Sequence, residues 1–265
     1  MTTITADSAS RPSDIGDAEW KVRTDLAACY RLVARYGMSD LIYNHITAKV
    51  PGSEGQGHFL INPFGLLYEE ITASCFYTLD LDGNVVRKPE APFFGDLPVN
   101  RAGFLIHSAI HGARHDLTCV MHTHTRAGMA VSAMKEGILP ITQTAMRFYG
   151  AVGYHDYEQP TADISERERI AHDLGPHSAM VMRNHGLIAC GPSVQDAWNL
   201  MYWLETACKV QVDVMASGAA LSLPSHELAT SMSRRYGPGG KINFAPMEWP
   251  ALLRQLDRED PSYKT

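Results

Sequence analysis

The chain has 265 residues, of which 45% are hydrophobic, a share typical of a globular protein and too high for a disordered one. It carries 23 basic and 29 acidic side chains, giving a net charge of −6, and the basic residues form no block. This balance argues against nucleic acid and anionic membranes as partners. The sequence holds neither an apolar run long enough to span a membrane nor a secretory signal.

The five cysteines are widely spread and never form a C-x-x-C pair. This pattern predicts buried free thiols in a reducing compartment, and therefore a cytoplasmic protein without a disulfide framework. Twelve histidines are a high number for this length, and they direct attention to metal or acid–base chemistry. No glycine-rich phosphate loop and no G-x-S-x-G nucleophile motif occurs.

Helical and strand-like patterns alternate along the chain and predict one α/β domain over 17–220. A flexible tail is expected over 1–16, and a C-terminal extension over 221–265 is expected to pack on the domain or on a neighbouring subunit. Strands are predicted at 46–50, 59–61, 77–81, 85–86, 118–122, 150–154, 179–183 and 187–190. Helices are predicted at 17–36, 69–75, 100–115, 125–134, 165–174, 193–218, 225–236 and 247–256, with a Ser165-x-x-Glu168 capping box at one start.

The segment Val120-Met-His-Thr-His carries the strongest local signal. Side chains at positions i and i+2 of a strand point to one face, so His122 and His124 can present two imidazoles to one ion. A second apolar strand ends at His185, which can supply a third ligand and leave an open coordination position, as in catalytic zinc sites. Chance occurrence in a histidine-rich chain is the alternative that the spacing alone leaves open.

Four other histidines lie at positions where a functional role has to be considered. His107, His111 and His115 share one face of the predicted helix, where a half-exposed surface is favoured over a metal site. His45 lies at or just before a strand. The sequence does not decide whether it lines a pocket or is a surface or hydrogen-bonded core residue.

Six ordered motifs over about residues 26–217 resemble the class II aldolase/adducin family. They are Asn44-His-Ile-Thr, Asn62-Pro-Phe-Gly-Leu-Leu-Tyr-Glu-Glu-Ile, Asn100-Arg-Ala-Gly-Phe-Leu-Ile-His-Ser-Ala-Ile-His, Val120-Met-His-Thr-His, Arg183-Asn-His-Gly-Leu-Ile-Ala-Cys-Gly and Pro192-Ser193. The resemblance implies a three-layer α/β/α sandwich with a largely antiparallel central sheet, and a homotetramer with sites at subunit interfaces. It also implies one divalent ion per chain on His122, His124 and His185. Zinc is favoured, with Mn²⁺, Co²⁺ and Fe²⁺ as alternatives, and the ion stabilises an enediolate.

The chain departs from the sugar-phosphate aldolases of this family at four places. Their acid/base glutamate lies nineteen positions before the first metal histidine, which is Gly103 here. Their phosphate-binding serines fall at Arg101 and Ala102, their Thr-Gly turn at Phe64-Gly65, and their phosphate-binding asparagine at His45. The resemblance therefore argues against a typical sugar-phosphate aldolase while keeping the metal ligands.

The replacements suggest a different substrate. Arg101 offers a planar donor pair for a carboxylate, and Phe64 makes the expected pocket more apolar and suited to an aromatic group. His45 is the first candidate for proton transfer and Tyr149 a weaker one, with Asn44, Gly65 and Gly103 lining the pocket.

Three functions remain open on the sequence. The leading hypothesis is a metal-dependent carbon–carbon lyase that cleaves or decarboxylates a carbonyl- or carboxylate-bearing small molecule. A non-haem iron oxygenase on the same fold is the second, and a non-catalytic binding module like the adducin head is the third.

Overall fold

The structure is a computed structural model, and it describes residues 11–89, 92–158 and 164–265. The strands are β1 (His45–Lys49), β2 (Phe59–Ile61), β3 (Tyr77–Leu79), β4 (Val85–Arg87), β5 (Cys119–Thr123), β6 (Val152–His155), β7 (Ala179–Met182) and β8 (Gly186–Gly191). The helices are α1 (Asp17–Arg35), α2 (Pro92–Gly95), α3 (Arg101–Ala113), α4 (Arg126–Ser132), α5 (Gln143–Met146), α6 (Ile164–Leu174), α7 (Val194–Ala216), α8 (His226–Tyr236) and α9 (Ala245–Glu259). Two short 3-10 helices are η1 (Tyr68–Glu70) and η2 (Pro261–Lys264).

The strands form one eight-stranded sheet in the order β4-β3-β2-β1-β5-β8-β7-β6. Every neighbouring pair is antiparallel except β6 and β7. The prediction of a largely antiparallel sheet is confirmed. The central strands β5 and β8 are buried along their whole length, which explains why they are apolar rather than alternating.

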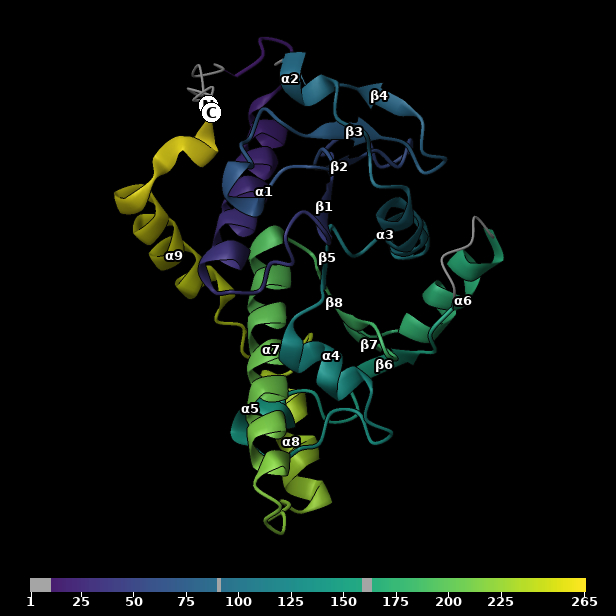
Figure 1. The fold of residues 1–265 in the computed structure, drawn as a ribbon, viewed down its shortest axis with the longest axis vertical. Helices are drawn as coiled ribbons and strands as arrows, with labels where there is room; N and C mark the ends of the chain where they lie inside the picture. The colour runs from purple at the N-terminus through teal and green to yellow at the C-terminus, as the bar shows by residue number, and fades with distance from the viewer. Residues whose placement is uncertain (1–10, 90–91, 159–163) are drawn as a thin grey trace.

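Helices cover both faces of the sheet and make three layers (Figure 1). On one face α1 and α7 pack against the sheet through a core that includes Leu26, Met121 and Leu204. On the other face α3 and α6 pack together over a second core that includes Ile110, Val120 and Ile170. The α/β/α sandwich expected from the resemblance is confirmed.

Several predicted local features are corrected. Of the helix expected over 69–75, only Glu69 and Glu70 are helical, as the end of η1. Ser165 lies inside α6, which already includes Ile164, and its hydroxyl accepts a hydrogen bond from Arg169, so it does not begin the helix as a capping box. His185 does not end a strand but lies in the turn between β7 and β8.

The C-terminal segment contacts the sandwich through α8, α9 and η2, and η2 packs against α1. Helix α9 packs against α1 and α7, and α8 packs against α5. Residues 1–10 of the expected tail lie outside the described residues, while Ile15 is buried. The division of the chain at residues 16 and 220 stays a prediction.

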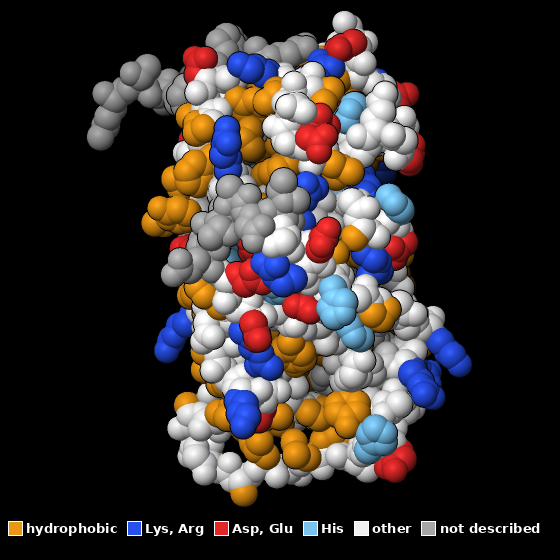
Figure 2. Space-filling view, turned by 90° about the vertical axis from the view of Figure 1, so that its right-hand side faces the viewer, with side chains coloured by type: hydrophobic (Ala, Val, Ile, Leu, Met, Phe, Trp, Pro, Cys, Tyr) orange, Lys and Arg blue, Asp and Glu red, His pale blue; other side chains and the backbone are white. Residues whose placement is uncertain are grey.

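No helix in the described ranges is long and apolar enough to cross a membrane. The face that carries α3 and α6 presents acidic and basic side chains interspersed (Figure 2). This distribution on the visible face agrees with the absence of a basic block in the sequence.

Candidate metal centre

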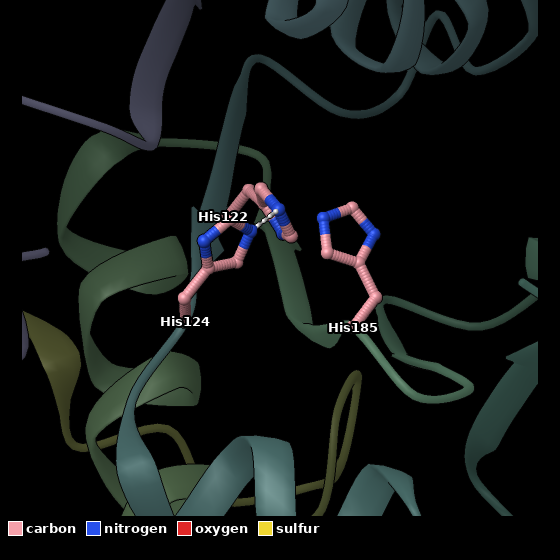
Figure 3. Close-up of side chains that lie close together, drawn as sticks. All are labelled: His122, His124 and His185. Atoms are coloured by element: carbon pink, nitrogen blue, oxygen red, sulfur yellow. Dashed lines mark hydrogen bonds between the residues drawn. The ribbon is translucent and has the colours of Figure 1, made fainter. Parts of the chain in front are cut away.

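Three histidines converge where β5 ends and β8 begins. His122 lies in β5, His124 follows its end, and His185 directly precedes β8. Because Thr123 pairs with Leu187 in the sheet, the turn before β8 is held beside the end of β5. One nitrogen from each histidine lies within 4.8 Å of the other two, and the three rings surround a common point (Figure 3).

Hydrogen bonds at the far side of two rings determine which nitrogen faces this point. His122 Nδ1 lies 3.0 Å from the carbonyl oxygen of Leu187, and His124 Nδ1 lies 3.2 Å from Asp40 Oδ2. Both partners are acceptors, so each Nδ1 carries the proton and each Nε2 presents a lone pair.

The two Nε2 atoms lie 2.9 Å apart (Figure 3). A hydrogen bond between them would require one ring to be charged, and burial holds the pKa of His122 well below its ordinary value. Two lone pairs at this distance fit a shared cation, because zinc takes imidazole nitrogens at about 2.0–2.1 Å. The residues therefore fit a divalent metal ion, which would be held by His122, His124 and His185.

The third histidine is positioned by an unusual turn. Asn184 has a positive φ of 57°, a conformation that asparagine tolerates better than most residues. At Gly186 a side chain is sterically excluded, because a Cβ would lie 2.3 Å from the carbonyl oxygen of Thr123. The Asn-His-Gly sequence is thus what this close turn requires. Burial, together with the neighbouring His124, lowers the pKa of His185 to about 4, which keeps its ring neutral and able to bind a cation.

His45 occupies the space that a side chain at position 103 would need. It begins β1 and pairs directly with His122 across the sheet. A Cβ on Gly103 would lie 2.1 Å from His45 Cε1 and Nε2. The His45 ring centroid is 6.0 Å from that of His122 and 4.3 Å from that of His107. The histidine therefore fills the place at which the sugar-phosphate aldolases are expected to carry their glutamate.

Burial lowers the pKa of His45 to about 4. Neither of its ring nitrogens makes a hydrogen bond of normal geometry within the described ranges. Asn44 directly before it has a positive φ of 67° and is also buried with both side-chain amide atoms unpaired. Two unpaired polar side chains beside the histidine cluster are the arrangement expected where a substrate or water supplies the missing partners.

The remaining predicted site residues lie in different surroundings. Phe64 is half-buried, with its ring centroid 6.0 Å from that of Tyr43, and Gly65 is exposed with φ of 122°. Arg101 is exposed at the first turn of α3, two residues before Gly103. Tyr149 lies next to α8, and its hydroxyl is hydrogen-bonded to His226 rather than to the histidine cluster.

The helix histidines do not form the half-exposed face that the sequence suggested. His107 and His111 are buried, and both rings lie 2.7 Å from the Thr47 hydroxyl on β1. His115 is exposed and follows the end of α3 at Ala113. The pair joins α3 to the sheet, and the sequence missed it because the hydroxyl partner lies sixty residues away in the chain.

Two carboxylates beside the centre were not predicted. Asp40 lies in the loop after α1, and no spacing links it to His124. Glu205 on α7 is buried, and its carboxylate accepts a hydrogen bond from Thr125, the residue that follows His124 and caps α4. A charged residue within the apolar pattern of α7 was the signal that could have identified Glu205.

Comparison with known proteins agrees with this geometry. The model of one family, described as class II aldolase and adducin N-terminal domain, matches residues 24–212. The chain belongs to the class II aldolase and adducin family. A Pseudomonas aeruginosa protein named provisionally as an aldolase class 2 protein is 43% identical, with all of both chains aligned. Rat alpha-adducin is 44% identical over 89% of this chain, which spans only 33% of the adducin.

Solved structures of the class II aldolase family share this fold. An aldolase II superfamily protein from Pseudomonas syringae is 46% identical, with a TM-score of 0.87 over 95% of this chain and 98% of its own. An L-fuculose 1-phosphate aldolase from Glaciozyma antarctica is 26% identical, with a TM-score of 0.79 over 94% of this chain and 96% of its own.

Proposed function

We propose that this class II aldolase family member is a divalent-metal-dependent lyase. It would break a carbon–carbon bond next to a carbonyl or carboxylate, by retro-aldol cleavage or decarboxylation. The observation that carries the proposal is the pair of Nε2 lone pairs of His122 and His124 facing each other at 2.9 Å, with both Nδ1 atoms committed to acceptors. Such an arrangement has little structural value without a cation between the rings.

When bound, the ion would act as a Lewis acid for the negative charge that develops on the substrate oxygen. Leu187 and Asp40 keep His122 and His124 in the required tautomer and orientation. His45, neutral at pH 7, has unpaired ring nitrogens next to His122, so it can accept or relay a proton there.

The same residues argue against a typical sugar-phosphate substrate. The His45 ring leaves no room for a glutamate at position 103 unless the ring moves. Phe64, Arg101 and His45 replace residues that the phosphate site is expected to need. We propose a substrate with a carboxylate for Arg101 and a flat apolar part for Phe64, with Asn44, Gly65 and Gly103 in the pocket wall.

Zinc is the ion we favour, since three neutral imidazoles suit it well, and Mn²⁺, Co²⁺ and Fe²⁺ are alternatives. We extend the proposal to a homotetramer, as expected from the family resemblance. Light scattering on the purified chain tests the assembly.

The similarity to adducins supports a second candidate. This chain is 44% identical to rat alpha-adducin over most of its own length, and a glycine occupies the position of the family glutamate. On this alternative the chain is a binding module, and the histidine cluster serves structure rather than turnover.

Turnover assays on single-metal forms separate these candidates. The chain is stripped with a chelator, loaded with Zn²⁺, Mn²⁺, Co²⁺ or Fe²⁺, and assayed on 4-hydroxy-2-oxo acids for pyruvate release and on aromatic hydroxy acids for CO₂ release. We expect product with the loaded wild type and none with His122→Ala. Oxygen uptake confined to the Fe²⁺ form would instead support an oxygenase. A fully loaded protein without turnover would overturn the lyase proposal and favour the binding module.

A further inference from the structure

A cavity of about 410 Å³ lies between the start of α7, the end of α5 and the loop that joins α8 to α9. Cys190 of β8 lines it, whereas His185 adjoins the other end of β8 at Gly186. A strand of this length spans roughly 16–20 Å, so the cavity is separate from the histidine cluster. Its volume lies within the usual range for small-molecule sites.

Arg147 is the lone cation among the described residues that line this cavity. Its guanidinium carbon lies 4.5 Å above the centre of the Trp203 ring. The guanidinium makes no hydrogen bond or ion pair within the described ranges, although it is half-buried. A stacked guanidinium keeps the N–H groups at its edge free, and that edge matches the two oxygens of a carboxylate.

The carboxylates around the cavity are already bonded. Asp116 accepts two hydrogen bonds from Arg114, and Asp196 accepts from Ser193 and Asn243. Glu248 is close enough to favour the charged form of Arg147, but its carboxylate accepts a hydrogen bond from Asn199. Ser193, Asn243 and Asn199 are neutral donors, so Asp196 and Glu248 keep their charge, but their oxygens are held by these donors, whereas the guanidinium edge of Arg147 has no acceptor within the described ranges.

Trp203 lies in the same wall, and its ring packs against the guanidinium of Arg147. The indole Nε1 of Trp203 is buried without an acceptor in the described part of the chain, and it has no exposed surface for a ligand in the cavity to contact. The donor that favours an anionic ligand is therefore Arg147 alone.

Three further aromatic side chains belong to the wall. Phe148, Tyr236 and Phe244 line the cavity, and the last two rings are parallel within 10°. The loop Gly237-Pro-Gly-Gly also lines it, and a Cβ on Gly237 would lie 2.3 Å from the carbonyl oxygen of Arg147. Flat apolar walls beside an unpaired guanidinium favour a planar ring that carries a carboxylate.

We propose that this cavity is a second ligand site, independent of the metal centre, and that it binds a small planar aromatic carboxylate through the Arg147 guanidinium. The site would bind its ligand whether or not the chain is a lyase.

Calorimetric titration with 1-naphthoate tests the site on the full chain. We expect saturable binding of one molecule per chain, weakened at least about 10-fold by Arg147→Gln and when the neutral 1-naphthamide replaces the acid. Arg254→Gln, which removes an exposed arginine on α9, is the matched control and should bind as the wild type does. His122→Ala should also bind normally, which separates this site from the metal centre.

Three outcomes of the titration overturn the proposal. They are no saturable binding to the wild type, equal binding by Arg147→Gln, and loss of binding in His122→Ala. Because Arg147 also packs on Trp203, its replacement can affect folding, so a second readout uses the unaltered protein. The chain has four tryptophans, and Trp203→Phe assigns their indole N–H resonances. We expect 1-naphthoate to shift the Trp203 resonance, and an unmoved Trp203 resonance at saturation would refute the site.

Discussion

The metal centre depends on single hydrogen bonds behind its rings. Asp40 accepts from His124 Nδ1 and thereby leaves Nε2 free for a cation. We predict that Asp40→Ala lowers zinc affinity by roughly 10–100-fold, the usual effect of losing such a partner. Competition with a chromophoric chelator measures it, and Asp82→Ala, an exposed residue, is the control. Equal affinity in the two variants would show that Asp40 does not orient His124.

Gly103 and Gly112 offer a matched pair within α3. A Cβ at position 103 would overlap the His45 ring, whereas one at position 112 meets only Leu81 Cδ1 at 3.8 Å. We predict that Gly103→Ala lowers the free energy of unfolding by about 1–3 kcal/mol, the cost of overpacking a filled site. Gly112→Ala should raise it by up to about 1 kcal/mol, because alanine favours the helix. Urea unfolding of both variants measures the difference, and a stable Gly103→Ala would mean that His45 moves freely.

The sequence was informative about some of these residues and silent about others. The alternation of His122 and His124 and the Asn184-His185-Gly186 turn have local causes, namely the strand period and a close backbone approach. Asp40 has no such cause, since the loop after α1 brings it to His124 from 84 residues away. Contacts between residues that are far apart in the sequence have no characteristic spacing, so they cannot be predicted from a local motif.

At the scale of elements, α3 is joined to β1 by buried histidines. His111 lies 2.7 Å from the Thr47 hydroxyl, and burial lowers its pKa to about 3. The folded chain thus takes up this proton less readily than the unfolded chain, whose histidines titrate near pH 6.5. The contribution of neutral His111 to the free energy of unfolding is therefore complete above pH 6.5 and is lost as the pH falls from 6.5 towards 3.

Unfolding free energy measured from pH 7 to pH 5.5 checks this dependence. We predict that His111→Asn makes the curve shallower than that of the wild type by roughly 1 kcal/mol per pH unit below pH 6.5. His115→Asn, at an exposed position after α3, should leave the slope unchanged. Parallel curves for the wild type and His111→Asn would contradict a neutral buried His111.

The hydrophobic periodicity of the sequence predicted the positions of helices and strands better than it predicted which of their side chains are buried. The helix predicted over 17–36 is α1, and the strand predicted over 59–61 is β2. The prediction that the α3 histidines are half-exposed was wrong. The apolar pattern placed His107 and His111 on the outer face of the helix, but in the structure β1 covers that face. The short α5 was also missed, since one helical turn has no amphipathic period.

At the scale of the whole molecule, a metal that binds only the folded chain must stabilise it. We predict that zinc at about 100 times its dissociation constant raises the free energy of unfolding by roughly 3 kcal/mol. Thermal unfolding with and without zinc should therefore show a clear rise in Tm for the wild type. His124→Ala should lose the rise, and an equal rise in that variant would place the zinc elsewhere.

The helix and strand patterns predicted one α/β domain, and the three-layer sandwich was expected from the family resemblance that the six ordered motifs carry. The reaction is a different matter. Gly103, His45 and Arg101 separate this chain from the sugar-phosphate aldolases that are expected to carry other residues there, but they do not define one substrate. Function depends on how a few side chains are placed rather than on the fold that carries them.

Every proposal about the site depends on His122, His124 and His185 holding one divalent ion. Metal content of the untagged chain, measured by plasma mass spectrometry beside His122→Ala, tests this binding. We predict close to one zinc, manganese, cobalt or iron per wild-type chain and its loss in the variant. A wild-type chain that retains no metal after incubation with each ion, or a variant that keeps its full metal content, would contradict it.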